Sequence, residues 1–150
     1  MPTLEEIQQA MANQILEELS IGTAGTAVPR IANLQVNHLM NIDPTPPAID
    51  IYPADPHQDA LTFGKSNNEM SFTVRARVST ADHQGGQSLL LTMMDPSALT
   101  SVTKAITSDR TLGGKVSGLG VSGPSGFGLY LDAGGQGSLM GATWTVRTMP

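Results

Sequence analysis

Apolar and polar side chains alternate without a break from residue 70 to residue 79. The apolar members are Met70, Phe72, Val74, Ala76 and Val78, and the polar members are Ser71, Thr73, Arg75, Arg77 and Ser79. A two-residue period is the pattern of a β-strand that buries one face and exposes the other. We therefore predict a strand over 70–79, with the two arginines on its solvent face.

The N-terminal segment has the period of a helix instead. Apolar residues at positions 4, 7, 11, 15 and 19 fall on one face at steps of three and four residues. Thr3 and Glu6 have the spacing of a capping box, in which the hydroxyl and the carboxylate bind free amides of the first helical turn. The helix should end near Ser20, because Gly22 and Gly25 follow it.

Two more helices are expected in the middle of the chain. Asp82 can cap a helix that runs to about Met94, and Gly85 and Gly86 should weaken its first turn by about 1 kcal/mol each relative to alanine. The apolar residues Leu99, Val102 and Ile106 indicate a shorter helix, closed by Gly113-Gly114.

The remaining segments predict short strands and loops. A short extended piece is expected at 34–37, and a strand at 48–52, with Ile49 and Ile51 inward and Asp50 outward. Residues 53–68 are expected to form a long polar loop, and loops of this length are usually functional or mobile.

The C-terminal part predicts three strand pieces, at 116–121, 128–132 and 140–147, separated by glycine-rich loops. The order of helix, strands, two helices and strands indicates an α+β fold. We expect one domain over 1–150, with a mixed or antiparallel sheet and the N-terminal and two central helices packed on one face. Residues 123–150 form a glycine-rich β extension of it.

The composition excludes several classes of protein. The 150 residues include no cysteine, which removes disulfides, thiolate zinc sites and cysteine nucleophiles. The net charge of −5 argues against nucleic-acid binding by bulk electrostatics. The longest aliphatic run, 89–91, is far shorter than a membrane span of about 20 residues, and the acidic N-terminus does not resemble a secretory signal. Only 14% of the residues are charged, which suggests that partners cover part of the surface.

No motif assembles an active site. Gly64-Lys65-Ser66 lacks the first glycine of a phosphate-binding loop, and the glycines at 118, 120 and 123 are not followed by a helix. His38, His57 and His83 lack the spacing of metal ligands. We expect no enzymatic activity, catalytic residue, cofactor or metal.

The charges are distributed unevenly along the chain. Residues 1–60 hold eight acidic side chains and one basic, whereas residues 61–150 hold five acidic and seven basic. If these halves lie on opposite flanks of the fold, copies placed head to tail attract one another, and such contacts can close a ring. Chance segregation of the charges is the alternative.

The segment from Ser97 to Val116, SALTSVTKAITSDRTLGGKV, resembles the tail terminator proteins of long-tailed siphovirus phages, particularly those of actinobacterial hosts. That family joins a helix of the form S-V-x-x-A-I to D-R-T-L-G-G and then a strand. The resemblance extends upstream to the strand entered through prolines at 46–53 and the alternating segment at 70–79, and covers most of residues 1–122. The glycine-rich part at 123–141 departs from the family pattern.

The resemblance implies a structural virion protein, located in the neck of the virion and assembled in the host cytoplasm. It would form a ring, expected to be a hexamer, at the head-proximal end of the tail tube. The ring would end tube polymerisation and join the head completion or connector protein, with DNA only passing through its channel and no membrane partner. The alternatives are another virion part of similar fold, such as a head completion or tail tube protein, and a small ligand-binding α+β domain.

Two sets of residues are candidates for assembly contacts. Arg75, Arg77, Asp109, Arg110 and Arg147 are assigned to the interface between ring subunits. For Arg75 and Arg77, lining the channel through which DNA passes is the alternative. For Asp109 and Arg110, a local ion pair with each other after the helix is the favoured alternative. Asp55, His57, Asp59 and Lys65, in the loop at 53–68, are assigned to contact with the tube or the connector.

Overall fold

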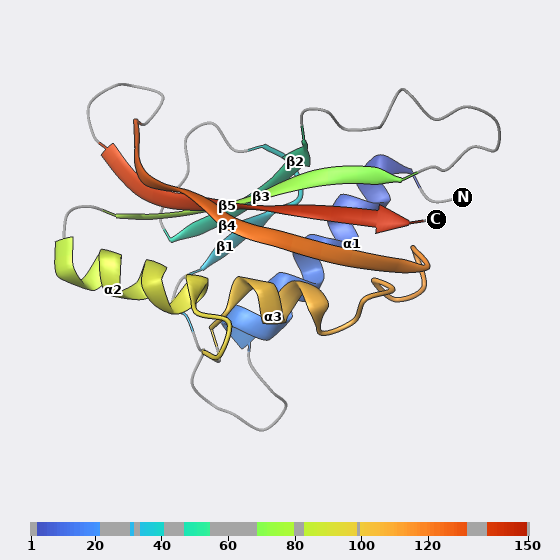
Figure 1. Ribbon diagram of the computed structural model, residues 1–150, viewed down its shortest axis with the longest axis horizontal. Helices are drawn as coiled ribbons and strands as arrows, with labels where there is room; N and C mark the ends of the chain where they lie inside the picture. Colours follow the sequence, from blue (N-terminus) through green and yellow to red (C-terminus); the bar gives the residue numbers. More distant parts are fainter. Residues whose placement is uncertain are drawn as a thin grey trace.

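The computed structural model describes residues 3–21, 31, 34–40, 47–54, 69–79, 83–98, 100–131 and 138–149. These residues form an α+β fold with one five-stranded mixed sheet, in the order β1-β2-β3-β5-β4 (Figure 1). The elements are α1 (Leu4–Leu16), η1 (Glu17–Ile21, a π-helical turn), β1 (Gln35–Asn37), β2 (Ala48–Pro53), β3 (Met70–Ser79), α2 (His83–Met94), α3 (Val102–Thr107), β4 (Gly118–Leu131) and β5 (Ser138–Met149). The α+β class expected from the sequence is confirmed.

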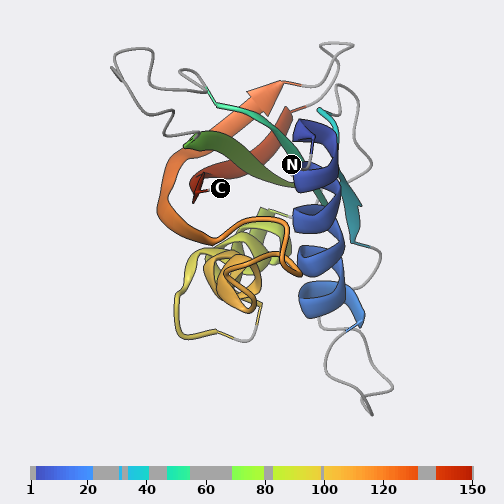
Figure 2. The same cartoon turned by 90° about the vertical axis from the view of Figure 1, so that its right-hand side faces the viewer.

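The sheet is antiparallel except at one edge, where β1 runs parallel to β2. The helices cover one face of it, and α1 runs along the side of β1 and β2 (Figure 2). The opposite face carries the polar residues of the alternating strand. This arrangement confirms the expected packing of the helices on one face.

The core lies between the helices and the apolar face of the sheet. Its largest fully buried side chains include Trp144 on β5, Phe72 on β3, and Ile7, Met11 and Ile15 on α1. Burying an apolar side chain of this size contributes about 1.5–3 kcal/mol relative to leaving it exposed. The alternation at 70–79 therefore assigned the correct face of β3 to the core.

Polar side chains lock α1 onto its neighbours. The capping box is present, since the Thr3 hydroxyl accepts from the Glu6 N–H and the Glu6 carboxylate accepts from the Thr3 N–H. Gln8 donates to the carbonyl of Ile51 at 3.0 Å, and Gln14 donates to the carbonyls of Ala105 and Ile106 at 3.0 and 2.7 Å. These bonds fix α1 against both the sheet and the end of α3.

Gly86 shows why a glycine stands in the first half of α2. A Cβ atom at this position would lie 2.2 Å from the carbonyl oxygen of Ser79, at the end of β3. The glycine lets the helix approach the strand, so its low helix propensity is offset by close packing. The predicted cap residue of this helix, Asp82, lies outside the described residues.

Two boundaries differ from the prediction. The short helix α3 ends at Thr107, and the chain continues in turns to Ser117, because Asp109 binds backbone amides that a longer helix would use. The predicted pieces at 116–121 and 128–132 are one strand, β4, with shifts of register between Ser122 and Gly128. β-Bulges accommodate the glycines and the proline between Ser122 and Gly128, where the sequence predicted a loop.

Candidate assembly surfaces

The strands β2 and β3 bring one carboxylate and two guanidinium groups together on the face of the sheet away from the helices. Asp50 lies directly opposite Arg75 in the strand register and accepts from its Nε at 3.1 Å and its Nη2 at 2.6 Å. Arg77 Nη2 lies 3.4 Å from the same carboxylate. Arg75 also lies over the ring of Tyr52, 5.2 Å from its centre.

This cluster corrects the prediction that Asp50, Arg75 and Arg77 face solvent. The side chains of Asp50 and Arg77 are 0% and 4% exposed, and that of Arg75 is 17% exposed. The residues lie on the predicted face, but the long arginines converge on the buried carboxylate. A buried charge requires a partner, so the first role of these arginines is to neutralise the buried Asp50 carboxylate within the subunit. A role for them between subunits stays a prediction.

The turn after α3 is held together by Asp109. Its carboxylate accepts from the N–H and hydroxyl of Thr111, at 3.0 and 2.7 Å, and from the N–H of Gly113 at 2.9 Å. The side-chain and backbone hydrogen bonds from Thr111, with that from Gly113, lower the pKa of Asp109 below its usual range. Leu112 and the two glycines after it have positive φ, which a turn of this kind needs.

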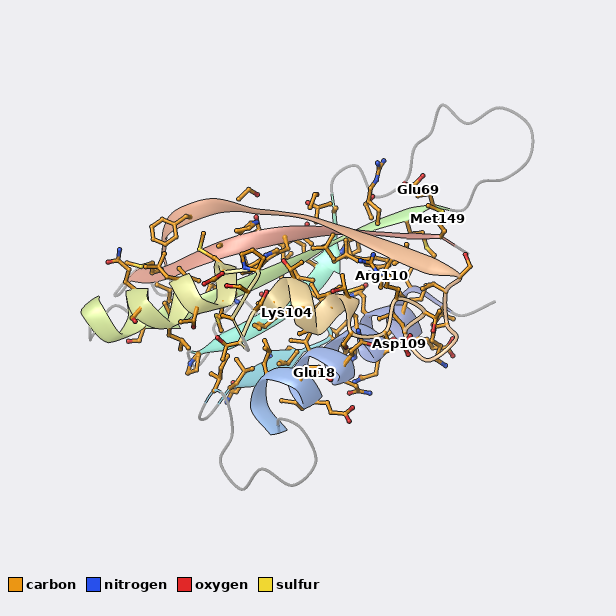
Figure 3. All side chains as sticks on the ribbon, turned by 60° about the horizontal axis from the view of Figure 1, so that its bottom comes forward. Glu18, Glu69, Lys104, Asp109, Arg110 and Met149 are labelled. Carbon is orange, nitrogen blue, oxygen red and sulfur yellow. The ribbon has the colours of Figure 1, made fainter. Side chains whose placement is uncertain are left out.

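Arg110 does not pair with Asp109, which corrects the local ion pair considered above. Its Nη1 donates to the carbonyl oxygen of Leu119 on β4 at 3.1 Å. The labels in Figure 3 show both residues, with Arg110 on the side of the strands. Arg110 therefore links the turn to the outermost strand of the sheet.

The outer edge of β4 has no strand partner among the residues that the structure describes. Backbone groups of successive residues in a strand point to alternate sides, so the groups of Val121 point the same way as the Leu119 carbonyl. β4 contains no charged side chain in its fourteen residues. Its first part, 118–122, pairs regularly with β5, whereas bulges interrupt the part after Ser122.

Gly118 and Gly120 are not required by the fold of this edge. Neither has a positive φ, and a Cβ atom at either position would meet no atom within 4 Å. A glycine inside a strand costs roughly 0.5–1 kcal/mol relative to alanine. Glycine in a strand often marks a place where another backbone approaches closely.

The other predicted contact residues are partly accounted for. Arg147 Nε lies 3.0 Å from the carboxylate of Glu69, with 63% and 25% of the two side chains exposed. Asp55, His57, Asp59 and Lys65 lie outside the described residues. Arg75 and Arg77 thus lie together around Asp50, and Arg110 binds β4. The structure does not bring the whole predicted set into one site.

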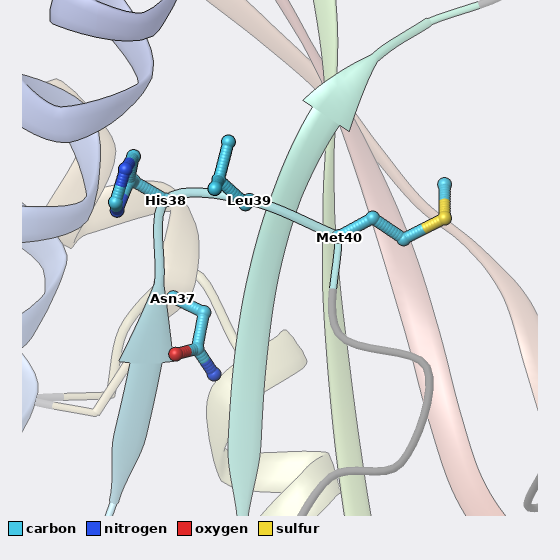
Figure 4. Close-up of a pocket in the computed structure, with 4 residues that line it drawn as sticks. All are labelled: Asn37, His38, Leu39 and Met40. Carbon is cyan, nitrogen blue, oxygen red and sulfur yellow. The ribbon is translucent and has the colours of Figure 1, made fainter.

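The flank formed by α1 and η1 is acidic. It carries Glu5, Glu6, Glu17 and Glu18 and no basic side chain. Glu5 pairs with His38 at 3.2 Å across the end of β1. Next to this pair, Asn37, His38, Leu39 and Met40 line an open pocket of about 260 Å³ (Figure 4). Leu39 and Met40 are 51% and 53% exposed, so apolar surface adjoins the acidic flank.

Within the described ranges, no three His, Asp or Glu side chains are grouped closely enough to bind a metal ion. In the same ranges, none of the helices combines the length and the apolar character needed to cross a membrane. Comparison of the sequence with models of known families gave no match, and a search of curated proteins found no relative.

The sequence reasoning missed the β4 edge. The sequence placed Gly118 and Gly120 in a short strand at 116–121 and matched them to an incomplete nucleotide-binding pattern, but it did not predict that this strand forms an edge. The available signal was the run of sixteen residues without a charge at 116–131, shortly after the D-R-T-L-G-G segment.

Proposed function

We propose that this chain is a structural subunit of a phage virion, a tail terminator of the long-tailed type. Copies of it assemble as a ring, expected to be a hexamer, at the head-proximal end of the tail tube. The ring ends tube polymerisation and presents the joining surface for the head completion or connector protein. DNA only passes through its channel.

One segment carries this proposal. Residues 97–116 resemble the tail terminator family in sequence, and the described residues from 100 onward contain a helix and a turn, followed by a strand, in the order that the resemblance implies. Ser101 caps α3 by accepting from the Lys104 N–H at 3.3 Å, and Val102, Ala105 and Ile106 are buried. The D-R-T-L-G-G residues form the Asp109 turn, and β4 follows it.

The surfaces of the described residues favour assembly over catalysis. The titratable groups that lie together are occupied by structural contacts: Asp50 with two arginines, Asp109 with backbone amides, and Arg110 with a carbonyl. A sheet that ends in a long uncharged strand instead offers backbone groups to a partner.

Electron microscopy of tail tubes tests the proposal. Purified protein is mixed with growing tubes that lack it, and tubes in buffer alone serve as the control. We expect one ring at one end of each tube, and tubes that stop lengthening. Decoration along the tube or incorporation into it would indicate another virion role. Absence of binding would favour a small ligand-binding domain.

A further inference from the structure

The outer edge of β4 between Gly118 and Ser122 combines three properties of a strand-pairing surface. Its backbone groups at Leu119 and Val121 point away from β5, with no strand beside them in the described part of the chain. Its glycines, Gly118 and Gly120, leave the sheet face beside an incoming strand free of side chains. Its side chains are uncharged, although natural edge strands are commonly protected by charges.

Within the part of the chain that the structure describes, the charged group that hydrogen-bonds to this edge comes from outside the strand. The guanidinium of Arg110 occupies the Leu119 carbonyl at 3.1 Å. Arg110 is held in place by its turn, because the neighbouring Asp109 carboxylate binds Thr111 and Gly113. An incoming strand needs the Leu119 carbonyl as an acceptor, so it has to displace Arg110.

We propose that the β4 edge at 118–122 docks a second copy of this chain, and that Arg110 guards this edge in the free subunit. This inference rests on the proposed function, since it names the contact by which ring subunits join. Strand addition to this edge supplies the affinity through main-chain hydrogen bonds. Arg110 delays the contact until it is displaced.

Charge complementarity identifies the occupant as a second copy. The β4 side, over residues 109–131 and 138–149, carries three basic side chains (Arg110, Lys115, Arg147) and one acidic (Asp109), and Arg147 is paired with Glu69. α1 and η1 carry four carboxylates and no basic side chain, and α1 lies beside β1, the strand at the other edge of the sheet. A contact between the β4 side of one copy and the β1 side of the next is head to tail. Such contacts form a ring where the rotation closes.

Two matched pairs of variants test the inference by the concentration dependence of the mass in sedimentation or light scattering. Arg110→Ala removes the guanidinium from the Leu119 carbonyl, whereas Lys115→Ala removes the same charge from an exposed site with no hydrogen bond to the described residues of β4. We expect Arg110→Ala to associate at a concentration at least about tenfold lower than Lys115→Ala, as the loss of a charged hydrogen bond implies. Equal association of the two variants would contradict the proposal that Arg110 hinders docking at the β4 edge.

Val121→Pro removes the N–H that points to the free side of β4 and places the proline ring in the path of an incoming strand. Thr145→Val, one strand further in, is its control. We expect Val121→Pro to remain monomeric in the Arg110→Ala background, and Thr145→Val in that background to associate. Circular dichroism must show an unchanged fold, which is expected because an edge strand tolerates proline where the N–H faces away from its partner strand. Association of Val121→Pro as strong as that of its control would overturn the β4 edge as the contact.

The failure of this inference and the failure of the proposed function are distinguishable. If the wild-type protein caps tail tubes and Val121→Pro also forms rings, the inference is wrong and the proposed function stands. If Val121→Pro alone loses self-association while the wild-type protein does not bind tubes, the β4 edge stands and the terminator role is wrong.

Discussion

The middle and the edge of the sheet pair their charged and polar groups in different ways. In the middle, Asp50 on β2 and the arginines of β3 neutralise one another below the surface. At the edge, Arg110 covers one carbonyl of β4 and remains exposed. A buried charge cluster is a permanent part of the fold, whereas an exposed bond to a strand edge can be exchanged for a partner. The comparison separates the residues that build this subunit from those available to join it to others.

The largest expected effect comes from breaking the cluster in the middle of the sheet. Asp50→Asn leaves two largely buried arginines without their carboxylate, and we expect a loss of about 3–5 kcal/mol in the free energy of unfolding. Urea denaturation measures it. The control is Glu69→Gln, which breaks the exposed pair with Arg147 and should cost only about 0–1 kcal/mol. Similar losses in the two variants would contradict the distinction between middle and edge.

The second prediction concerns the glycine that the fold does require. Gly86→Ala forces a Cβ atom against the Ser79 carbonyl, and we expect a loss of about 1–3 kcal/mol as helix α2 shifts away from β3. Thermal unfolding followed by circular dichroism measures it. A variant as stable as the wild-type protein would show that α2 and β3 are less close than described.

A smaller effect of opposite sign is expected at the edge. Gly118→Ala should raise the free energy of unfolding of the free subunit by about 0.4–1 kcal/mol, because the site has open space and no positive φ. The same thermal unfolding experiment applies, at a concentration where the protein is monomeric. Destabilisation would mean that the subunit itself needs this glycine.

The smallest effect is a dependence on pH. The hydrogen bonds from Thr111 and Gly113 lower the pKa of Asp109 in the folded state. Its contribution to stability is therefore complete above the pKa of the unfolded chain, about 3.9, and is lost as the pH falls through the lower folded value. Asp109→Asn should make the loss of stability below about pH 4 shallower than in the wild-type protein. Identical slopes in urea titrations between pH 2 and 6 would exclude this role of the carboxylate.

The sequence predicted more of the middle of this molecule than of its edge. The periods of 3.6 and 2 residues identified α1 and β3, because amphipathic patterns determine which face is buried. They did not predict the burial of Arg77, which depends on the register that places Asp50 opposite Arg75. That register joins segments about 25 residues apart, and the pattern within one segment does not predict how it aligns with another.

The edge was harder to predict for physical reasons. Glycine and proline usually indicate loops, but β4 accommodates them as bulges while continuing to pair with β5. Asp109 and Arg110 are adjacent and opposite in charge, so an ion pair was the natural expectation. The turn instead directs them apart, Asp109 to backbone amides and Arg110 to Leu119.

Amide hydrogen exchange, measured on the free subunit and on the assembled protein, tests this account most directly. We predict that the amides of β3 exchange slowly in both states, because this strand lies between β2 and β5. The amides of Leu119 and Val121 should exchange quickly in the free subunit and become protected on assembly. Protection of these two amides in the free subunit, or no change on assembly, would contradict the assignment of the β4 edge as the surface that joins the subunits.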